Sequence, residues 1–111
     1  MPKKPVIPRE TEPRGLDFAT ALDLMRNGGS VSRLGWTEGG PGTPMFLVLI
    51  PGRRIMASFE PMATHLGKGA EFLVHDHIDA ILEGDDDHPH CVVGWNLSQD
   101  DMLADDWFLV P

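Results

Sequence analysis

Residues 93–107 read Val-Gly-Trp-Asn-Leu-Ser-Gln-Asp-Asp-Met-Leu-Ala-Asp-Asp-Trp, and the expected fold is built around them. Ser98 is followed three residues later by Asp101 and then by an apolar run, which is the pattern of a short helix with a capped start. Trp95 and Trp107 flank this turn, and large aromatic side chains favour burial. The stretch therefore predicts a strand, a short helix and a final strand.

One longer helix is predicted upstream, starting after Asp17. Apolar side chains recur from Phe18 to Met25 with the i, i+3, i+4 and i+7 spacing of one helix face. Asp17 is a suitable N-cap, and Asn-Gly-Gly at residues 27–29 ends the helix, because glycine readily adopts the backbone conformation found there. We expect the apolar face of this helix to pack on a sheet.

The remaining apolar segments predict short strands. Residues 45–50 are a continuous apolar run, and the Pro51-Gly52 turn after them predicts residues 53–59 as their hairpin partner at the centre of the sheet. Residues 70–78 and 79–82 are interpreted as one extended segment or a broken pair of strands. Further strands are expected at residues 30–33, 91–95 and 107–110, and a helical turn at residues 62–66.

Strands that follow one leading helix through short turns predict an α+β fold. The expected architecture is a small antiparallel sheet with one N-terminal helix packed on one face and a short helical turn before the last strand. Residues 16–111 are expected to form a single ligand-binding domain, because 111 residues suffice for one modest core. Residues 1–15 hold four prolines without apolar periodicity and are expected to be a disordered N-terminal arm.

The distribution of charge limits the possible partners. The formal net charge is −8, but residues 1–15 hold four cations and two acids, so residues 16–111 carry five cations against fifteen acids. A domain this acidic repels DNA and RNA, and nucleic acid is not an expected partner. A small anionic ligand remains compatible where cations gather locally. The best candidates are Arg33, Arg53 and Arg54.

The sequence gives no indication of export or of a membrane span. Prolines follow Lys3 and Lys4 where a signal peptide is apolar, and the longest apolar run, residues 45–50, is far shorter than the ~20 residues that span a bilayer. The single cysteine, Cys91, excludes an internal disulfide. We therefore expect a soluble cytoplasmic protein without a membrane partner.

A metal site is the strongest chemical alternative. His75 and His77 are predicted to point to the same side of one strand, and residues 85–91 add His88, His90 and several carboxylates. A metal-dependent hydrolase could be assembled from these four histidines. However, His-Glu-x-x-His and paired Cys-x-x-Cys spacings are lacking, and residues 85–91 have the composition of an acidic hairpin tip. We expect no metal and no cofactor.

Nucleophilic and acid–base catalysis have little support. Ser98 lies in no Gly-x-Ser-x-Gly elbow, and Cys91 has no histidine spaced to orient it. The neighbouring pairs Asp100-Asp101 and Asp105-Asp106 point in different directions on a helix or strand and are typical of caps and solvated faces. The sequence therefore predicts a binding protein rather than an enzyme.

Three separated blocks resemble one known family. Residues 95–107 are similar to the C-terminal signature of the second type of Thoeris anti-defence protein, from a small phage and bacterial family formerly of unknown function. The other two blocks are Phe18-Ala19-Thr20-Ala21-Leu22 with Gly28, Val31, Arg33 and Gly35-Trp36, and Met45-Phe46-Leu47 with Pro51-Gly52. The blocks occur in the family's order and cover most of residues 16–110.

The resemblance implies a function and an assembly. It implies a protein that sequesters a nucleotide immune signal, a cyclic ADP-ribose isomer made by a bacterial Toll/interleukin-receptor-type enzyme. The signal is held without turnover, so the downstream immune effector stays inactive. The resemblance further implies a homotetramer in the cytoplasm of the bacterial host, with ligand pockets between protomers.

The resemblance also assigns the site residues. Phe18 and Trp36, with Trp95 as a second platform, are expected to stack on nucleobase faces. Arg33 is expected to meet phosphate as a charged donor. The residues expected to bond ribose hydroxyls or base edges are Asn96, Ser98, Gln99 and Asp101. Trp107 is expected to anchor the core instead.

Two departures from the family pattern leave other ligands open. Trp36 is followed by Thr-Glu-Gly-Gly-Pro where the family has Asn and a Gly-Lys-Gly-like turn, and Gly94 stands where the family has proline. Cyclic dinucleotides are therefore an alternative ligand class. A third interpretation is a ligand-free adaptor that uses residues 1–15 as a docking peptide.

Overall fold

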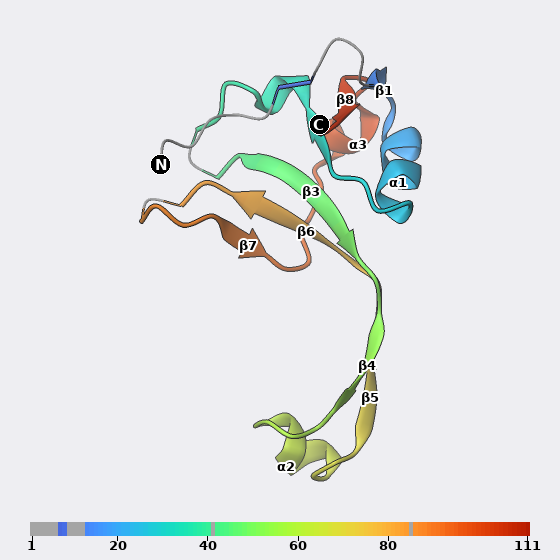
Figure 1. Cartoon of the computed structure of the whole chain (residues 1–111), viewed down its shortest axis with the longest axis vertical. Helices are drawn as coiled ribbons and strands as arrows, with labels where there is room; N and C mark the ends of the chain where they lie inside the picture. The colour runs from blue at the N-terminus through green and yellow to red at the C-terminus, as the bar shows by residue number, and fades with distance from the viewer. Residues whose placement is uncertain (1–6, 9–12, 41, 85) are drawn as a thin grey trace.

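The computed structural model describes residues 7–8, 13–40, 42–84 and 86–111. Their main element is a six-stranded antiparallel sheet (Figure 1). In spatial order its strands are β1 (Arg14–Leu16), β8 (Trp107–Leu109), β2 (Val31–Arg33), β3 (Pro44–Ile50), β6 (His77–Leu82) and β7 (His90–Val92). Every neighbouring pair in this order is antiparallel. The predicted α+β class is confirmed.

The predicted long helix is α1 (Phe18–Arg26), which packs against β2, β3 and β8. Asp17 caps it as expected, because its side chain accepts a hydrogen bond of 2.9 Å from the backbone N–H of Thr20. Ala21 and Met25 are buried where the helix meets the sheet. The N-terminal helix therefore covers one face of the sheet, as its apolar periodicity predicts.

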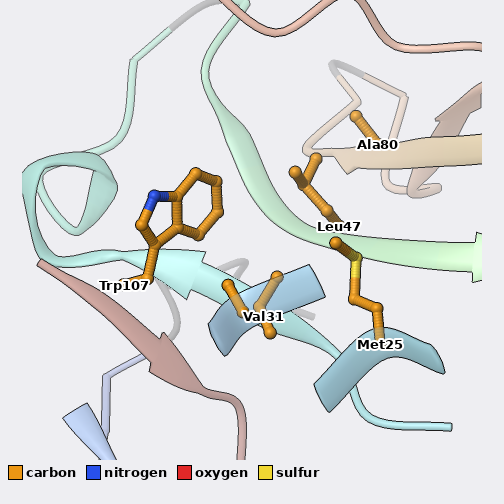
Figure 2. Packing of buried hydrophobic residues seen from close by; sticks show 6 residues of the cluster. Met25, Val31, Leu47, Ala80 and Trp107 are labelled. Carbon is orange, nitrogen blue, oxygen red and sulfur yellow. The ribbon is translucent and has the colours of Figure 1, made fainter. Parts of the chain in front are cut away.

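The core lies between α1 and the sheet (Figure 2). Met25 from the helix meets Val31, Leu47 and Ala80 from three adjacent strands, and Trp107 joins the same cluster from β8. None of these five residues is more than 2% exposed. Val31 and Ala80 both pair with Leu47, from opposite sides. The apolar run of β3 is therefore explained by its place inside the sheet.

Shorter helices form where the sequence predicts them. α3 (Gln99–Leu103) begins with a capping box, in which the Ser98 hydroxyl accepts from the Asp101 N–H at 3.1 Å. In return, the Asp101 carboxylate accepts from the Ser98 N–H at 3.4 Å. α2 (Met62–Leu66) is the expected helical turn, and a 3₁₀ turn, η1 (Leu34–Trp36), follows β2.

The predicted hairpin between residues 45–50 and 53–59 is wrong. β3 pairs with β2 on one side and with β6 on the other, so both of its edges are filled. β4 (Arg53–Met56) pairs instead with β5 (Glu71–Val74), in a second sheet of two strands. The apolar run finds its neighbours in distant parts of the chain, which local turn signals do not report.

The chain leaves the main sheet after β3 and returns before β6. At this crossing the Gly52 N–H donates to the Asp76 carboxylate at 2.6 Å. A Cβ atom at position 52 would lie only 2.4 Å from the Val74 carbonyl oxygen, so the close approach of the two segments requires glycine. The Pro-Gly pair is therefore an exit point and not a tight reversal.

Residues 51–76 form an extension that we call the projecting hairpin. It consists of β4, α2 and β5 and stands away from the body of the molecule (Figure 1). The molecule spans 51 × 32 × 25 Å, and its radius of gyration of 16.5 Å exceeds the ~13 Å typical of a compact chain of this length. Residues 70–82 do form two separate strands, β5 and β6, but the break falls at residues 75–76 and not between residues 78 and 79 as predicted.

The first strand begins earlier than the sequence suggests. Arg14 and Gly15, assigned above to the disordered arm, belong to β1, which pairs with β8. Of the rest of that arm, residues 1–6 and 9–12 lie outside the described residues. In the described ranges, no helix combines the length and the apolar character needed to cross a membrane.

Candidate functional site

Trp107 is the centre of the candidate site. Its indole is fully buried, and its ring centroid lies 5.3 Å from that of Phe18 and 5.2 Å from that of Trp36. The Trp107 Nε1–H donates to the backbone carbonyl of Asp101 at 2.9 Å. This one side chain therefore holds the start of α1, the η1 turn and α3 together, and its predicted role as a core anchor is confirmed.

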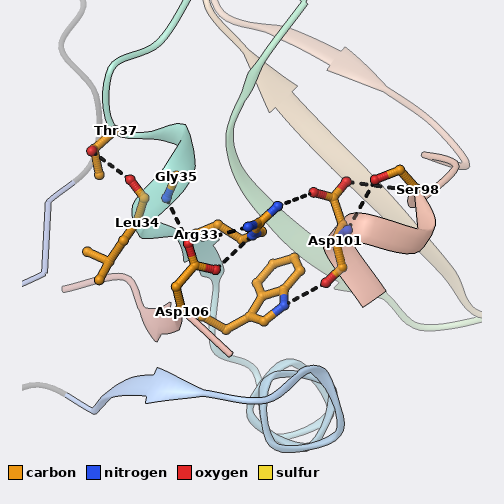
Figure 3. A network of polar contacts seen from close by, with 8 residues as sticks. Arg33, Leu34, Gly35, Thr37, Ser98, Asp101 and Asp106 are labelled. Atoms are coloured by element: carbon orange, nitrogen blue, oxygen red, sulfur yellow. Dashed lines mark hydrogen bonds and ion pairs between the residues drawn. The ribbon is translucent and has the colours of Figure 1, made fainter. Parts of the chain in front are cut away.

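Arg33, at the end of β2, is clamped between two carboxylates (Figure 3). Its Nη1 donates to Asp101 Oδ1 at 2.6 Å, and its Nε donates to Asp106 Oδ1 at 2.8 Å. The exposed fractions of the three side chains are 18% for Arg33, 14% for Asp101 and 26% for Asp106. These partly buried, charge-assisted bonds are stronger than ion pairs at a fully exposed surface.

Asp106 ties this clamp to the η1 turn. Its second carboxylate oxygen accepts from the Gly35 N–H at 2.9 Å, and its backbone carbonyl accepts from the Leu34 N–H at 3.1 Å. Burial acts to raise the pKa of Asp106, but the hydrogen bonds from Arg33 and Gly35 outweigh it, so the pKa is lowered. The hydrogen bond to Asp106 also raises the pKa of Arg33 against the effect of burial. Arg33 and Asp106 are therefore both charged at neutral pH.

The polar residues at the start of α3 divide into two kinds. Ser98 and Asp101 are engaged in the capping box, and Asp101 in addition binds Arg33. Asn96 and Gln99, on either side of Ser98 in the chain, are exposed. Of these predicted ligand-binding residues, Asn96 and Gln99 therefore present their amide groups most openly to a ligand.

Trp95 packs against the core next to β6, whereas Trp107 lies on β8, nearer the other edge of the sheet. Its backbone N–H donates to the Ile78 carbonyl at 2.8 Å, beside β6, and its half-buried ring packs against the core cluster. The Trp95 Nε1 is buried and has no hydrogen-bond partner within the described residues. An unpaired buried donor costs about 1–3 kcal/mol, so an acceptor brought to this atom would stabilise the protein.

The structure brings most of the predicted site residues into one region. Phe18 and Trp36 touch Trp107, while Arg33 and the α3 start form the polar network beside it (Figure 3). Sequence reasoning missed Asp106, which it grouped with solvated carboxylates. The pairing of β2 with β8 would have been needed to find it. In that pairing Arg33 lies opposite Trp107, which brings it next to Asp106.

The histidines do not gather as the metal hypothesis requires. The His77 Nδ1 lies 2.7 Å from Asp79 at the start of β6, whereas the His90 Nε2 lies 3.0 Å from Asp86 near the far end of that strand. These ends are ~17 Å apart at the usual rise of a strand. His75 lies in no strand, so its predicted placement on one strand with His77 is wrong. Among the described residues, no group of three or more His, Cys, Asp or Glu side chains is placed to hold a metal ion.

The buried carboxylate of Asp79 holds neighbouring segments of the chain together. It accepts from the Gly94 N–H at 3.0 Å and contacts His77, and the Cys91 thiol donates to its other oxygen at 3.7 Å. Burial acts to raise the pKa of Asp79, but the hydrogen bonds from His77 and Gly94 outweigh it, so the pKa is lowered. Asp79 therefore fastens the segment after β7 to β6.

A hollow of about 510 Å³ lies at the base of the projecting hairpin. Its lining residues are Gly52, Arg53, Arg54, Leu73, Val74, His75 and Asp76. It gathers two of the three cations that the sequence suggested for an anionic ligand. It includes none of the aromatic or polar residues around Trp107, so Arg53 and Arg54 lie apart from the aromatic cluster, whereas Arg33 lies beside it.

Comparison with family models gives a match over most of the chain. A family model described as Tad2-like, Thoeris anti-defense 2-like domain, matches residues 16–110. No curated protein matches the chain. The matched range contains Trp107 and all of the contacts described around it.

Proposed function

The chain belongs to the Thoeris anti-defense 2-like family, and on this premise we propose that it sequesters a cyclic ADP-ribose-type signal. It binds the nucleotide without turnover in the bacterial cytoplasm and so keeps the immune effector inactive. The observation that carries the proposal is the family match over residues 16–110, which spans the whole Trp107-centred cluster. An acidic domain with this cluster suits a small ligand better than a polynucleotide.

The aromatic residues supply the stacking surfaces in this proposal. Phe18 and Trp36 are half-buried, and each packs on the fully buried ring of Trp107, so little conformational entropy is lost when a nucleobase stacks on them. Trp95 is the second platform. Its buried Nε1–H, which has no partner among the residues that the structure describes, is a donor suited to a ligand or protomer oxygen.

The polar residues supply orientation. Asn96 and Gln99 bond ribose hydroxyls or base edges, and Ser98 and Asp101 fix their positions through the α3 cap while facing the same ligand. Arg33 donates to phosphate through the N–H groups that remain beyond its bonds to Asp101 and Asp106. Because two carboxylates already balance its charge, Arg33 acts as an oriented donor more than as a net positive charge.

Sequestration sets a demand on affinity. A protein that acts by stoichiometric removal must hold its ligand with a dissociation constant near or below the nanomolar range, about −12 kcal/mol. Such affinity for a small ligand requires an enclosed, preorganised pocket. Pockets formed between protomers of a homotetramer meet this requirement, and the tetramer is part of the proposal.

The test is a depletion and release experiment. The purified protein is mixed with a panel of cyclic ADP-ribose isomers and cyclic dinucleotides, unbound compound is removed by filtration, and the protein is heat-denatured. Mass spectrometry then identifies what is released. Release of an intact cyclic ADP-ribose isomer is the expected result.

Each other result excludes the proposal in a different way. Release of an intact cyclic dinucleotide alone would change the ligand class. An altered product would establish catalysis, and a chelator-treated sample would then separate a metal-dependent hydrolase from a metal-independent one. No depletion of any compound would favour the adaptor interpretation.

A further inference from the structure

The hollow at the base of the projecting hairpin lies apart from the residues around Trp107. Residues 52–54 line it from one strand and residues 73–76 from the other. In the pairing of β4 with β5, Arg53 lies opposite Val74 and Arg54 lies opposite Leu73. The volume of about 510 Å³ falls within the range of about 300–1,000 Å³ found for small-molecule sites. The hollow therefore has room for a small organic molecule and not only for a single ion.

The two arginines of the hollow are weakly engaged by the rest of the chain. Among the described residues Arg53 forms no ion pair, and Arg54 approaches only Glu71, at 3.9 Å, with side chains that are 76% and 64% exposed. An exposed pair at this distance contributes little. Arg33, in contrast, is bonded to two carboxylates. Both guanidinium groups of the hollow therefore keep N–H donors for an incoming anion.

The other polar residues of the hollow are His75 and Asp76. The Asp76 carboxylate already accepts from the Gly52 N–H at 2.6 Å, and the His75 ring forms no hydrogen bond with the described chain. The lining thus carries two cations against one acid, whereas residues 16–50 and 77–111 together hold two cations against twelve acids. A small anion is therefore attracted to this hollow more than to the acidic surface around it.

Apolar side chains lie beside the arginines. Leu73 is 66% exposed, and Val74 is half-buried. A ligand that joins an anionic group to an apolar or ring-shaped body would use both kinds of lining. Phosphate suits the anionic group best, because the guanidinium fork binds it with two parallel hydrogen bonds and a phosphomonoester carries close to two negative charges at neutral pH.

We infer that this hollow is a binding site for a small organic phosphomonoester. The phosphate is held by Arg53 and Arg54, and the organic body lies against Leu73 and Val74. The site is separate from the cluster around Trp107, and the inference goes beyond the proposed function without depending on it.

The first test compares four probes that divide the ligand into its parts. Phenyl phosphate, inorganic phosphate, benzoate and phenol are titrated calorimetrically into the full chain at physiological salt. Phenyl phosphate should bind saturably and more tightly than the other three, and nitrogen-15 spectra should show its largest amide shifts around Gly52. Absence of saturable binding, equal affinity for inorganic phosphate or benzoate, or shifts centred on Trp107 would overturn the inference.

The second test removes the charges of the hollow. Arg53→Gln combined with Arg54→Gln should weaken phenyl phosphate binding roughly tenfold or more, because charge-assisted hydrogen bonds are lost. Lys68→Gln is the matched control, since it removes a cation from the same hairpin at an exposed position outside the lining. Equal weakening by the control would reduce the effect to general attraction and overturn the site.

The depletion experiment keeps this site apart from the proposed function. The double arginine variant should release the same nucleotide as wild type, and Trp36→Ala should still bind phenyl phosphate. Loss of phenyl phosphate binding in Trp36→Ala would overturn the separate site. A wild-type protein that binds phenyl phosphate but depletes no nucleotide would contradict the proposed function alone.

Discussion

Arg33 Nε and Asp106 Oδ1 lie 2.8 Å apart and join the end of β2 to the residue that leads into β8. The same carboxylate holds the Gly35 N–H of the η1 turn, which carries Trp36. A single acid thus fixes an arginine and positions an aromatic ring of the candidate site. Asp106 therefore contributes both to the stability of the fold and to the position of Trp36.

Asp106→Ala should destabilise the protein. The change leaves the Gly35 N–H without its acceptor and Arg33 with only one carboxylate, and we expect a loss of about 1–3 kcal/mol in the free energy of unfolding. Urea unfolding followed by tryptophan fluorescence measures it. Asp105→Ala is the matched control, because Asp105 is exposed and adjacent. Equal losses for both variants would contradict the structural role of Asp106.

Stability should fall on acidification through the same carboxylate. The folded pKa of Asp106 is lower than its unfolded value, which is about 3.9, so the folded state binds the proton less readily than the unfolded state. The stabilisation is therefore complete above the unfolded pKa and is lost as pH falls through the folded pKa. Unfolding free energies of wild type and Asp106→Asn, measured from pH 6 downward, should differ by a constant amount down to about pH 4 and approach each other only below it. Parallel curves would rule out this linkage.

Ser98→Ala should weaken the start of α3. It removes the acceptor of the Asp101 N–H, and loss of an N-cap costs about 1 kcal/mol. Thermal unfolding monitored by circular dichroism provides the measurement. Ser98→Thr, which keeps a capping hydroxyl, should recover most of the loss. If the alanine variant were as stable as wild type, the capping box would contribute nothing to folding.

Trp36→Ala should weaken ligand binding in the proposed function. Loss of one stacking contact costs about 1–3 kcal/mol, which corresponds to a roughly 5- to 150-fold weaker affinity for the released nucleotide. Calorimetric titration measures it, with light scattering to verify an unchanged assembly. Trp36→Phe retains an aromatic face and should bind more tightly than the alanine variant. Unchanged affinity in an intact assembly would remove Trp36 from the pocket.

The elements that the sequence predicted correctly are those with local causes. The periodicity of α1, the Asp17 cap and the Ser98 capping box each depend on residues within a few positions of one another. Their hydrogen bonds are decided by the neighbouring backbone, so the sequence is enough to predict them.

The predictions from sequence failed where a strand pairs with a segment far away in the chain. A strong turn signal at Pro51-Gly52 predicted a hairpin, but β3 finds its partners in β2 and β6. His75 and His77 were separated for the same reason, because the chain re-enters the main sheet between them. Local propensities do not encode which edge of a strand meets which distant segment.

The fold class, the positions of the α-helices, the acidic balance and the family can all be inferred from the amino-acid sequence, because they follow from periodicity, composition and local motifs. The clamping of Arg33 by Asp101 and Asp106, and the departure of residues 51–76 from the body as a hairpin, are visible only in the folded chain. Both outcomes depend on long-range strand pairing, which is favoured by burial of the core between α1 and the sheet and not by any short stretch of chain.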